Sequence, residues 1–152
     1  MKVNNTMIAI ASDHAGYELK RVIIEYLNSK GLEYHDYGAY SLESVDYPIY
    51  ARLAAGAVAS GTAERGILVC GTGIGMAIAA NKLSGIRCAQ CDGVLQAERS
   101  RSHNDANMIA LGELIVDAEQ AIQILDIWLN TEFEQGRHAR RVALIEATDE
   151  KE

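Results

Sequence analysis

The segment 66–80, with the sequence GILVCGTGIGMAIAA, constrains the fold of this chain most strongly. The apolar run that ends at Cys70 predicts a buried strand, and the small apolar residues after the glycines predict a helix. Between them, three alternating glycines predict a tight turn. The backbone N–H groups of such a turn, together with a helix N-terminus, can bind a negative charge. We therefore expect a strand–turn–helix unit that presents an anion site beside the thiol of Cys70.

The rest of the chain alternates in the same way between short apolar runs and segments with the apolar spacing of amphipathic helices. Strands are predicted at 7–12, 32–37, 66–70, 86–91 and 108–111. Besides the helix after the glycine turn, helices are predicted at 16–30, 48–60, 93–102, 116–129 and 136–147. This order predicts an α/β fold: a doubly wound, Rossmann-like parallel sheet of about five strands, in one domain over residues 1–152. The C-terminal helix is extra to that unit, and we expect it to dock on a partner subunit.

The composition is that of an ordinary globular protein, with 49% hydrophobic and 23% charged residues. A formal net charge of −7 and the lack of a long Lys/Arg run argue against nucleic acid as a partner. Apolar runs such as 51–59 are too short to cross a membrane, and the first residues do not resemble a secretory signal. Three cysteines, an odd number, argue against a disulfide framework. We therefore expect a cytoplasmic protein with no membrane partner.

The glycine turn first suggests a dinucleotide site, because GTGIG matches the start of the G-x-G-x-x-G fingerprint. Met76 stands where the last glycine is required, and the turn follows the third predicted strand, whereas the fingerprint normally follows the first. Asp92, at the end of the next strand, stands where an acidic ribose ligand belongs. A non-catalytic nucleotide-binding module of Rossmann-like fold therefore stays open as an alternative, as does a purely structural turn.

The cysteines raise two further hypotheses. A free cysteine such as Cys70 often serves only as a small buried apolar residue. At a helix N-terminus, however, its thiolate is stabilised, and it can act as a nucleophile or a general base. Cys88 and Cys91 form a CxxC pattern, but their odd separation in a predicted strand points them to opposite faces, and there is no second pair. We therefore expect no metal site at these two residues.

Polar residues lie beside two of the predicted strands. Asp13 and His14 follow the first strand, and His103 and Asn104 precede the fifth. Asp13 alone could be a helix cap, and a lone histidine could be an ordinary surface residue. Loops of a parallel sheet can share a crevice, however, so we expect the two clusters to meet.

A basic cluster lies near the C-terminus. In GRHARR, Arg137 and Arg141 are four residues apart and therefore lie on one face of the predicted helix. Such a face is either solvated or a phosphate clamp. In a chain with a net charge of −7, this density of cations favours the clamp.

Five motifs occur in a distinctive order: SDHAGYELK, DYP at 46–48, CGTGIGMAIAANK, SRSHNDAN at 100–107, and GRHARR. Together they resemble the ribose-5-phosphate isomerase B family, which also contains galactose-6-phosphate and allose-6-phosphate isomerases. The resemblance covers nearly the whole chain. It implies an aldose–ketose isomerase that acts on a small phosphorylated sugar, ribose 5-phosphate first, through a cis-enediolate and without metal or cofactor. It also implies a homodimer or tetramer with the site between two subunits.

The resemblance implies a role for each candidate residue. Asp13 and His103 would assist opening of the furanose ring. Cys70 would be the base that moves a proton between C2 and C1, and Thr72 would handle the proton on the adjacent oxygens. The implied binding residues are Gly71, Thr72, Gly73, Ile74 and Gly75 at the enediolate, Tyr47 and Asn104 at the sugar hydroxyls, and His14, Arg137 and Arg141 at the phosphate. Some family members use a glutamate further along the loop as the base; this chain reads Gly75-Met76-Ala77 there and has Cys70, so the cysteine type is expected.

One motif departs from the family pattern. After the HND segment the family usually has Gly-x-Arg, with the arginine at the phosphate, and this chain reads Gly112-Glu113-Leu114. A charge-assisted contact contributes about 1.5–3 kcal/mol, so its loss would weaken phosphate binding roughly ten- to a hundredfold. Either Arg101 or Arg140 compensates, or the substrate is another aldose, such as a tetrose phosphate, a hexose phosphate or a free sugar.

Overall fold

The computed structural model describes residues 6–147, which form a five-stranded sheet with all strands parallel and the order β2-β1-β3-β5-β4. The strands are β1 (Ile8–Ser12), β2 (Tyr34–Asp36), β3 (Arg65–Cys70), β4 (Cys88–Gln90) and β5 (Met108–Gly112). The helices are α1 (Tyr17–Ser29), α2 (Tyr47–Ala59), α3 (Ile74–Ala80), α4 (Val94–Ser102), α5 (Ala118–Asn130) and α6 (Arg137–Glu146). The predicted α/β fold class, the parallel sheet and the extra C-terminal helix are confirmed.

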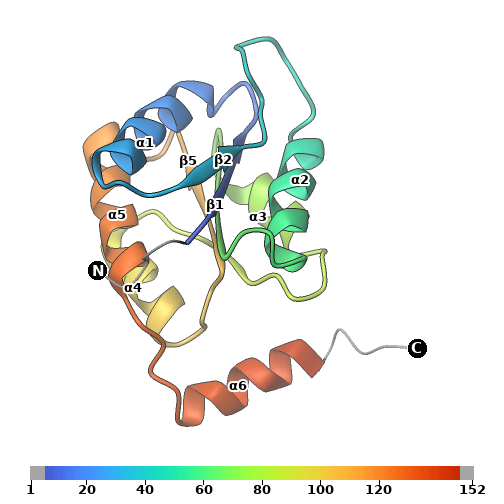
Figure 1. Ribbon diagram of the computed structural model, residues 1–152, viewed down its shortest axis with the longest axis vertical. Helices are drawn as coiled ribbons and strands as arrows, with labels where there is room; N and C mark the ends of the chain where they lie inside the picture. The colour runs from blue at the N-terminus through green and yellow to red at the C-terminus, as the bar shows by residue number, and fades with distance from the viewer. Residues whose placement is uncertain (1–5, 148–152) are drawn as a thin grey trace.

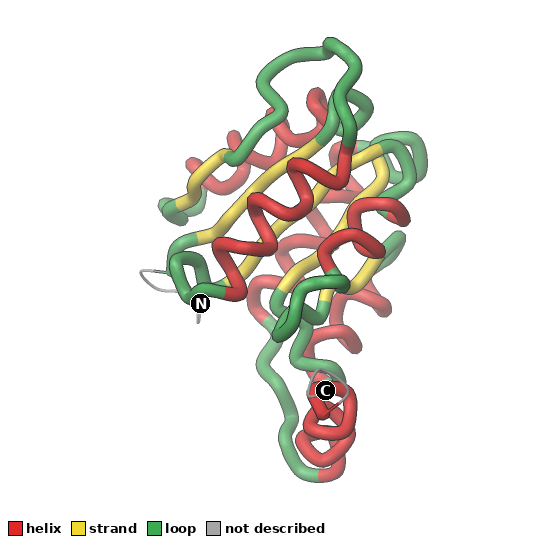
Figure 2. The backbone as a smooth tube through the Cα atoms, turned by 90° about the vertical axis from the view of Figure 1, so that its right-hand side faces the viewer, coloured by secondary structure: helices red, strands yellow, loops and turns green. Residues whose placement is uncertain are grey.

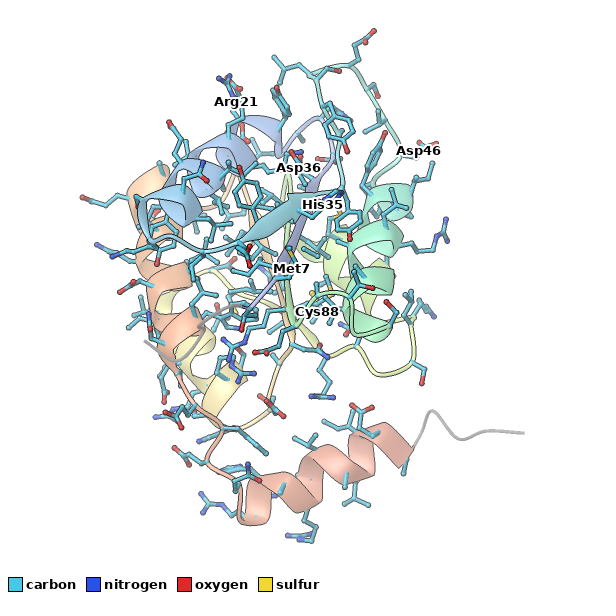
Figure 3. All side chains as sticks on the ribbon, in the orientation of Figure 1. Met7, Arg21, His35, Asp36, Asp46 and Cys88 are labelled. Atoms are coloured by element: carbon cyan, nitrogen blue, oxygen red, sulfur yellow. The ribbon has the colours of Figure 1, made fainter. Side chains whose placement is uncertain are left out.

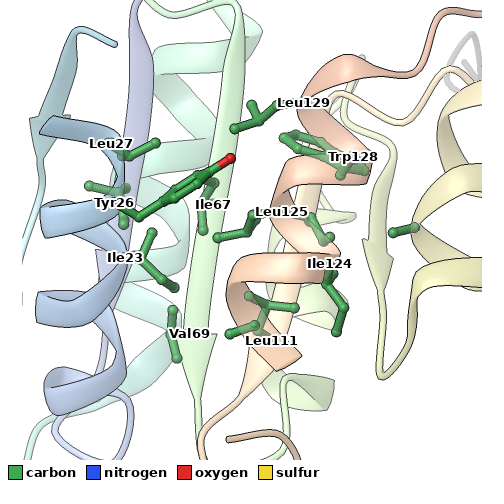
Figure 4. Close-up of a cluster of buried hydrophobic side chains, with 14 of the residues drawn as sticks. Ile23, Tyr26, Leu27, Ile67, Val69, Leu111, Ile124, Leu125, Trp128 and Leu129 are labelled. Carbon is green, nitrogen blue, oxygen red and sulfur yellow. The ribbon is translucent and has the colours of Figure 1, made fainter. Parts of the chain in front are cut away.

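Helices cover both faces of the sheet, with α1, α4 and α5 on one face and α2 and α3 on the other (Figure 1). The first face packs large side chains, among them Ile23, Leu125 and Trp128 (Figure 4). The second face is built largely from alanines, including Ala51, Ala54 and Ala55 of α2. Small side chains let a helix approach the sheet closely, so α2 lies tightly against the central strands.

The register of the central strands places three loops at one edge of the sheet. Ser12 at the end of β1 pairs with Val69, and Cys70 at the end of β3 pairs with Gly112 at the end of β5. The chain runs outward from β1 to β2 and then returns past β1 to β3, so the winding reverses between β1 and β3. Open α/β sheets bind ligands outside the carboxyl ends of the strands at such a reversal.

Both edge strands are shorter than predicted. The expected strands at 32–37 and 86–91 are reduced to β2 and β4, because an edge strand has a neighbour on one side only and loses its ladder sooner at each end. Cys88 and Cys91 pack into the clusters on opposite faces of the sheet, as predicted. Burial raises the pKa of both thiols, that of Cys91 to about 11, so both serve as uncharged side chains of the core.

The helix α6 projects beyond the amino edge of the sheet, outside the helical layers (Figures 1 and 2). It is attached near its beginning by His138, which stacks on His103, and near its end by an ion pair between Glu146 and Arg87. Its Leu144 is 61% exposed. Within residues 6–147, no helix is both long enough and apolar enough to cross a membrane.

One hydrogen bond on the large-residue face yields a test of the fold. Tyr26 of α1 is buried in this cluster (Figure 4). Its hydroxyl donates to Asp126 Oδ1 of α5 at 2.8 Å. We expect Tyr26→Phe to lower the free energy of unfolding by about 1 kcal/mol in chemical denaturation at neutral pH.

The same variant should respond differently to alkali. Burial, followed by the contact with Asp126, raises the pKa of Tyr26 above its ordinary value of 10.0. Above that pH the unfolded chain releases a proton that the folded chain keeps, so this tyrosine makes stability fall as the pH rises. We expect a smaller loss between neutral pH and about pH 11 in Tyr26→Phe than in the parent. Tyr34→Phe is the control, because within residues 6–147 its hydroxyl makes no hydrogen bond; an equal change there would contradict the assignment.

Candidate functional site

The loops after β1 and β3, with the start of α2, enclose a hollow of about 520 Å³ at the carboxyl edge of the sheet. Its lining consists of Asp13, Ala15, Tyr47, Cys70, Gly71, Thr72, Ile74, Gly75 and Ile78. Most of the residues predicted to carry out the chemistry are therefore brought together. The residues predicted before β5 and on α6 are absent from this lining.

Cys70 is the last residue of β3 and is only 5% exposed. Its Sγ accepts a hydrogen bond from the backbone N–H of Gly73 at 3.1 Å. Gly73 has φ +82°, a left-handed conformation that turns the chain back toward the sulfur and favours glycine. Thr72 is exposed, and its Oγ1 accepts a hydrogen bond from the N–H of Ile74 at 3.2 Å, which stabilises the turn at the start of α3. The turn thus directs a backbone donor at the sulfur.

Asp13 and His14 extend β1 into the same edge. Asp13 is buried, and its Oδ1 accepts from the N–H of Gly16 at 3.0 Å. The carboxylate is thereby oriented while its second oxygen has no hydrogen-bond partner among the described residues. His14 Nδ1 accepts from the N–H of Val45 at 3.1 Å. The neutral form of His14 therefore carries its proton on Nε2, which can donate to a ligand.

A buried lysine, absent from the sequence-based predictions, fixes the loop that reaches His14. Lys20 of α1 is 1% exposed, and its Nζ pairs with Asp36 Oδ1 at 2.8 Å and donates to the carbonyl of Ala39. Asp36 lies at the end of β2, facing α1 (Figure 3). Burial lowers the pKa of Lys20, and the pairing with Asp36 opposes that shift. Its signal in the sequence was a position on the apolar stripe, three residues before Ile23.

Tyr47 begins α2 and lies against the glycine turn. A Cβ at Gly75 would be 2.7 Å from the Tyr47 ring, so only glycine at this position allows the ring to approach. The ring is 40% exposed and lines the hollow. The contact between Tyr47 and the sugar hydroxyls that the resemblance implies stays a prediction.

His103 and Asn104 lie at the opposite edge of the sheet. Both residues precede β5, whereas Cys70 pairs with the last residue of β5. At about 3.3 Å per residue, the length of β5 alone separates the two groups by about 13 Å. The expectation that the two polar clusters share one crevice in the same chain is therefore not met. In a parallel sheet, residues that precede a strand and residues that follow one occupy opposite edges.

At that amino edge, His103 belongs to a cluster with α6. The rings of His103 and His138 stack with centroids 4.0 Å apart. Glu134 Oε1 lies 3.9 Å from His103 Nε2 and 3.6 Å from His138 Nε2. Burial, followed by the charges of neighbouring groups such as Arg137, lowers the pKa of His138. Arg137 and Arg141 are exposed on the same helix, four residues apart as predicted.

The two arginines considered as substitutes for the family arginine differ sharply. Arg101 is buried, and its guanidinium donates to Asp105 Oδ1 and to the carbonyls of Ala106 and Thr131. These contacts hold the segment before β5, so Arg101 is not available to a ligand. Arg140 is exposed on α6.

Leu114, where the family pattern has arginine, lies beside the glycine turn. Its N–H donates to the carbonyl of Gly71 at 3.0 Å, and a Cβ at Gly71 would be 3.5 Å from Leu114 Cδ1. The side chain is 79% exposed. An apolar group therefore stands next to the hollow at the position of the missing cation.

Comparisons with known proteins agree on one family. Residues 8–145 match the family described as Ribose/Galactose Isomerase. The chain is 46% identical over 144 residues to "Ribose-5-phosphate isomerase B" of Escherichia coli, covering 95% of this chain and 97% of that one. It is also 46% identical over 139 residues to "D-erythrulose-4-phosphate isomerase" of Pectobacterium atrosepticum, covering 91% of each chain.

Solved structures give the same result. The crystal structure of ribose-5-phosphate isomerase B from Mycoplasma genitalium with bound ribulose-5-phosphate is similar, with a TM-score of 0.94 and 37% identity, over 97% of this chain and 99% of that one. The match to these proteins covers nearly the whole chain. It therefore includes the sheet, the glycine turn beside Cys70 and the extra C-terminal helix. This chain belongs to the Ribose/Galactose Isomerase family.

Proposed function

We propose that this protein is an aldose–ketose isomerase that interconverts ribose 5-phosphate and ribulose 5-phosphate without a metal or cofactor. The observation that carries the proposal is the thiol of Cys70, which is buried at the end of β3 and receives a hydrogen bond from Gly73 in the hollow. The substrate is supported by the names of the Escherichia coli relative and of the Mycoplasma genitalium structure. The three free cysteines support a reducing compartment such as the cytoplasm.

The proposed reaction moves one proton between two carbons. The Cys70 thiolate removes the proton from C2 of the open-chain aldose, and the electron pair forms the C1–C2 double bond of a cis-enediolate. The thiol then returns the proton to C1, while the Thr72 hydroxyl relays a proton from O2 to O1. The backbone N–H groups of the turn would stabilise the negative oxygen as it forms. One such donor typically contributes about 10²–10³ in kcat.

The proposed site requires a second copy of the chain. Asp13 and Cys70 lie in the hollow, whereas His103, Arg137 and Arg141 lie at the other edge. We propose a homodimer, or a tetramer built from such dimers, in which the amino edge of one chain meets the carboxyl edge of its partner. His103 would then assist ring opening together with the partner's Asp13, and the arginines would bind the phosphate. Two exposed apolar side chains of α3 that line the hollow, Ile74 and Ile78, support such an interface.

A tetrose phosphate is the second candidate substrate. Leu114 removes a cation beside the hollow, and the Pectobacterium atrosepticum relative is named for D-erythrulose 4-phosphate. The reaction and the residues would be the same. The nucleotide-binding alternative is weaker, because Met76 is fully buried in the core where the dinucleotide fingerprint requires glycine.

The first test removes the base. Cys70→Ala should lower kcat for ketose formation from ribose 5-phosphate by about 10² or more, because alanine lacks the sulfur that the turn positions as the base. The assay is run in EDTA, in which the parent enzyme should keep its full activity. Parallel assays with aldose phosphates and free aldoses of four to six carbons rank the substrates.

The control for this test is Cys91→Ala, which makes the same substitution on the opposite face of the sheet. It should retain parental kcat, and circular dichroism should be unchanged in both variants. Near-full activity of Cys70→Ala would exclude the thiol as the base. A parent that binds a nucleotide and isomerises no sugar would exclude the isomerase.

A complementation experiment tests the shared site. Cys70→Ala and His103→Asn should each be inactive alone. Random pairing after co-expression gives mixed dimers in which one of the two sites has both native residues, so about a quarter of the parental activity should return. Co-expression of Cys70→Ala with Cys70→Ser should restore none. Mixed dimers that are present by native mass spectrometry but inactive would show that Cys70 and His103 of different chains do not form one site.

Leu114→Arg tests the missing cation. A new charge-assisted contact of about 1.5–3 kcal/mol should lower KM for ribose 5-phosphate by about ten- to a hundredfold. Leu95→Arg, at another exposed leucine, serves as the matched control and should leave KM unchanged. An unchanged KM in Leu114→Arg would mean that another cation, such as Arg140, already binds the phosphate, or that the substrate has no phosphate group near residue 114.

A further inference from the structure

We propose that His103, Glu134 and His138 form a binding site for a divalent transition-metal ion such as Zn²⁺, and that the bound ion inhibits the enzyme. The three side chains converge at the junction between α4, the segment before α6, and α6 itself. Their ligand atoms all lie within 4.8 Å of one another. The binding of the ion follows from this geometry alone, whereas the inhibition rests on the proposed function.

The spacing of the three ligand atoms is close to that of a metal site. Ligands of a tetrahedral zinc ion with bonds of about 2.0–2.1 Å are about 3.3 Å apart. Glu134 Oε1 is 3.6 Å from His138 Nε2 and 3.9 Å from His103 Nε2. The side chain of Glu134 is 56% exposed, so its carboxylate can adjust to an ion. A shift of a few tenths of an ångström at the carboxylate would bring it to bonding distance of a metal held by either histidine.

A buried nitrogen provides an independent reason to expect a ligand. His138 is 5% exposed, and among the described residues its Nε2 has no hydrogen-bond partner. Leaving a buried polar atom unpaired costs free energy. A neutral imidazole nitrogen carries a lone pair that can bind a metal. A metal bound to Nε2 would satisfy this atom. Glu134 Oε1 lies 3.6 Å from Nε2, too far for a hydrogen bond.

The type of ligand selects the class of ion. Two imidazoles and one carboxylate form the His₂Glu set that binds zinc with further positions open to water or substrate. Imidazole nitrogen favours zinc, copper, nickel and cobalt over magnesium and calcium, which prefer oxygen. Magnesium should therefore not bind this site at concentrations at which zinc binds.

The cluster is held in place, but one ring must move. His138 lies near the beginning of α6, and the ion pair between Glu146 and Arg87 fixes the other end of that helix to the start of β4. The rings of His103 and His138 are only 13° from parallel, whereas two imidazoles bound to one ion are splayed. His103 is less buried than His138, so we expect His103 to rotate and the stack to break.

That rotation explains the inhibition. In the proposed reaction His103 assists ring opening in the partner's site, and a nitrogen bound to zinc can neither donate nor accept a proton. The ion would therefore act on a group that the reaction needs while leaving Cys70 intact. Removal of the ion by EDTA would restore activity.

The test measures binding and inhibition separately, on full-length protein without an affinity tag. In calorimetry, Zn²⁺ should bind the parent at one site per chain. Loss of a group that only supports a metal ligand lowers affinity roughly 10–100-fold, so Glu134→Gln, which removes a ligand, should weaken zinc binding at least as much. Co²⁺ should give visible absorption bands in the parent that are lost in Glu134→Gln. Glu119→Gln, an exposed glutamate of α5, is the matched control and should bind as the parent does.

Two further variants separate this site from other zinc-binding groups and from catalysis. Cys70→Ala should retain zinc binding, because the thiol lies at the other edge of the sheet. Glu134→Gln should keep parental kcat in EDTA and require about tenfold or more zinc for half-inhibition. Equal zinc affinity in Glu134→Gln and the parent, or loss of binding in Cys70→Ala, would overturn the site. Zinc bound at the cluster of an active enzyme without inhibition would overturn the inhibitory role, and a chain without isomerase activity would still reveal the site by calorimetry.

Discussion

The parallel direction of all five strands is the constraint on which the rest of the structure depends. It assigns every polar side chain to one of two edges, according to whether the residue follows or precedes a strand. Asp13 follows β1 and Cys70 ends β3, and both lie in one hollow, whereas His103 precedes β5 and lies about 13 Å or more away. No rearrangement of loops within one chain removes that distance. The proposal that two chains complete each site follows from sheet polarity.

Buried polar contacts then fix the loops of the carboxyl edge to one another. Glu113, after β5, accepts from the N–H of Leu19 in the first turn of α1 and donates its own N–H to the carbonyl of Cys70. Lys20, one residue further along α1, pairs with Asp36 and binds the loop after β2. A buried pair adds little net stability, but loss of one partner costs about 3–5 kcal/mol. These contacts therefore define where the loops lie more than they add to the stability of the fold.

The strands and helices could be predicted because their signals are local. The apolar run that ends at Cys70 and the glycines that follow it lie within a few residues of the strand and helix that they define. Lys20 and His138 were missed as functional elements because their partners, Asp36 and His103, are distant in the sequence. The sequence motif containing His103 could indicate chemistry but not the edge at which that chemistry lies. The edge is set by whether a residue comes before or after its strand. The sequence already placed His103 before the predicted strand at 108–111, but the expectation of a shared crevice did not take this order into account.

The charges around α6 act on phosphate and on metal in opposite ways. In the proposed site, Arg137 and Arg141 would attract the phosphate dianion of the substrate, although the net charge of the chain is −7. The same cations repel a divalent metal ion. In water, that repulsion amounts to about 1 kcal/mol for each arginine at a separation near the Debye length of about 8 Å. Metal–ligand bonds contribute far more, about 10–16 kcal/mol in structural zinc sites. Short-range coordination therefore outweighs the repulsion. The negative charge of Glu134, which lies within 4 Å of both imidazoles, offsets part of the repulsion from the arginines.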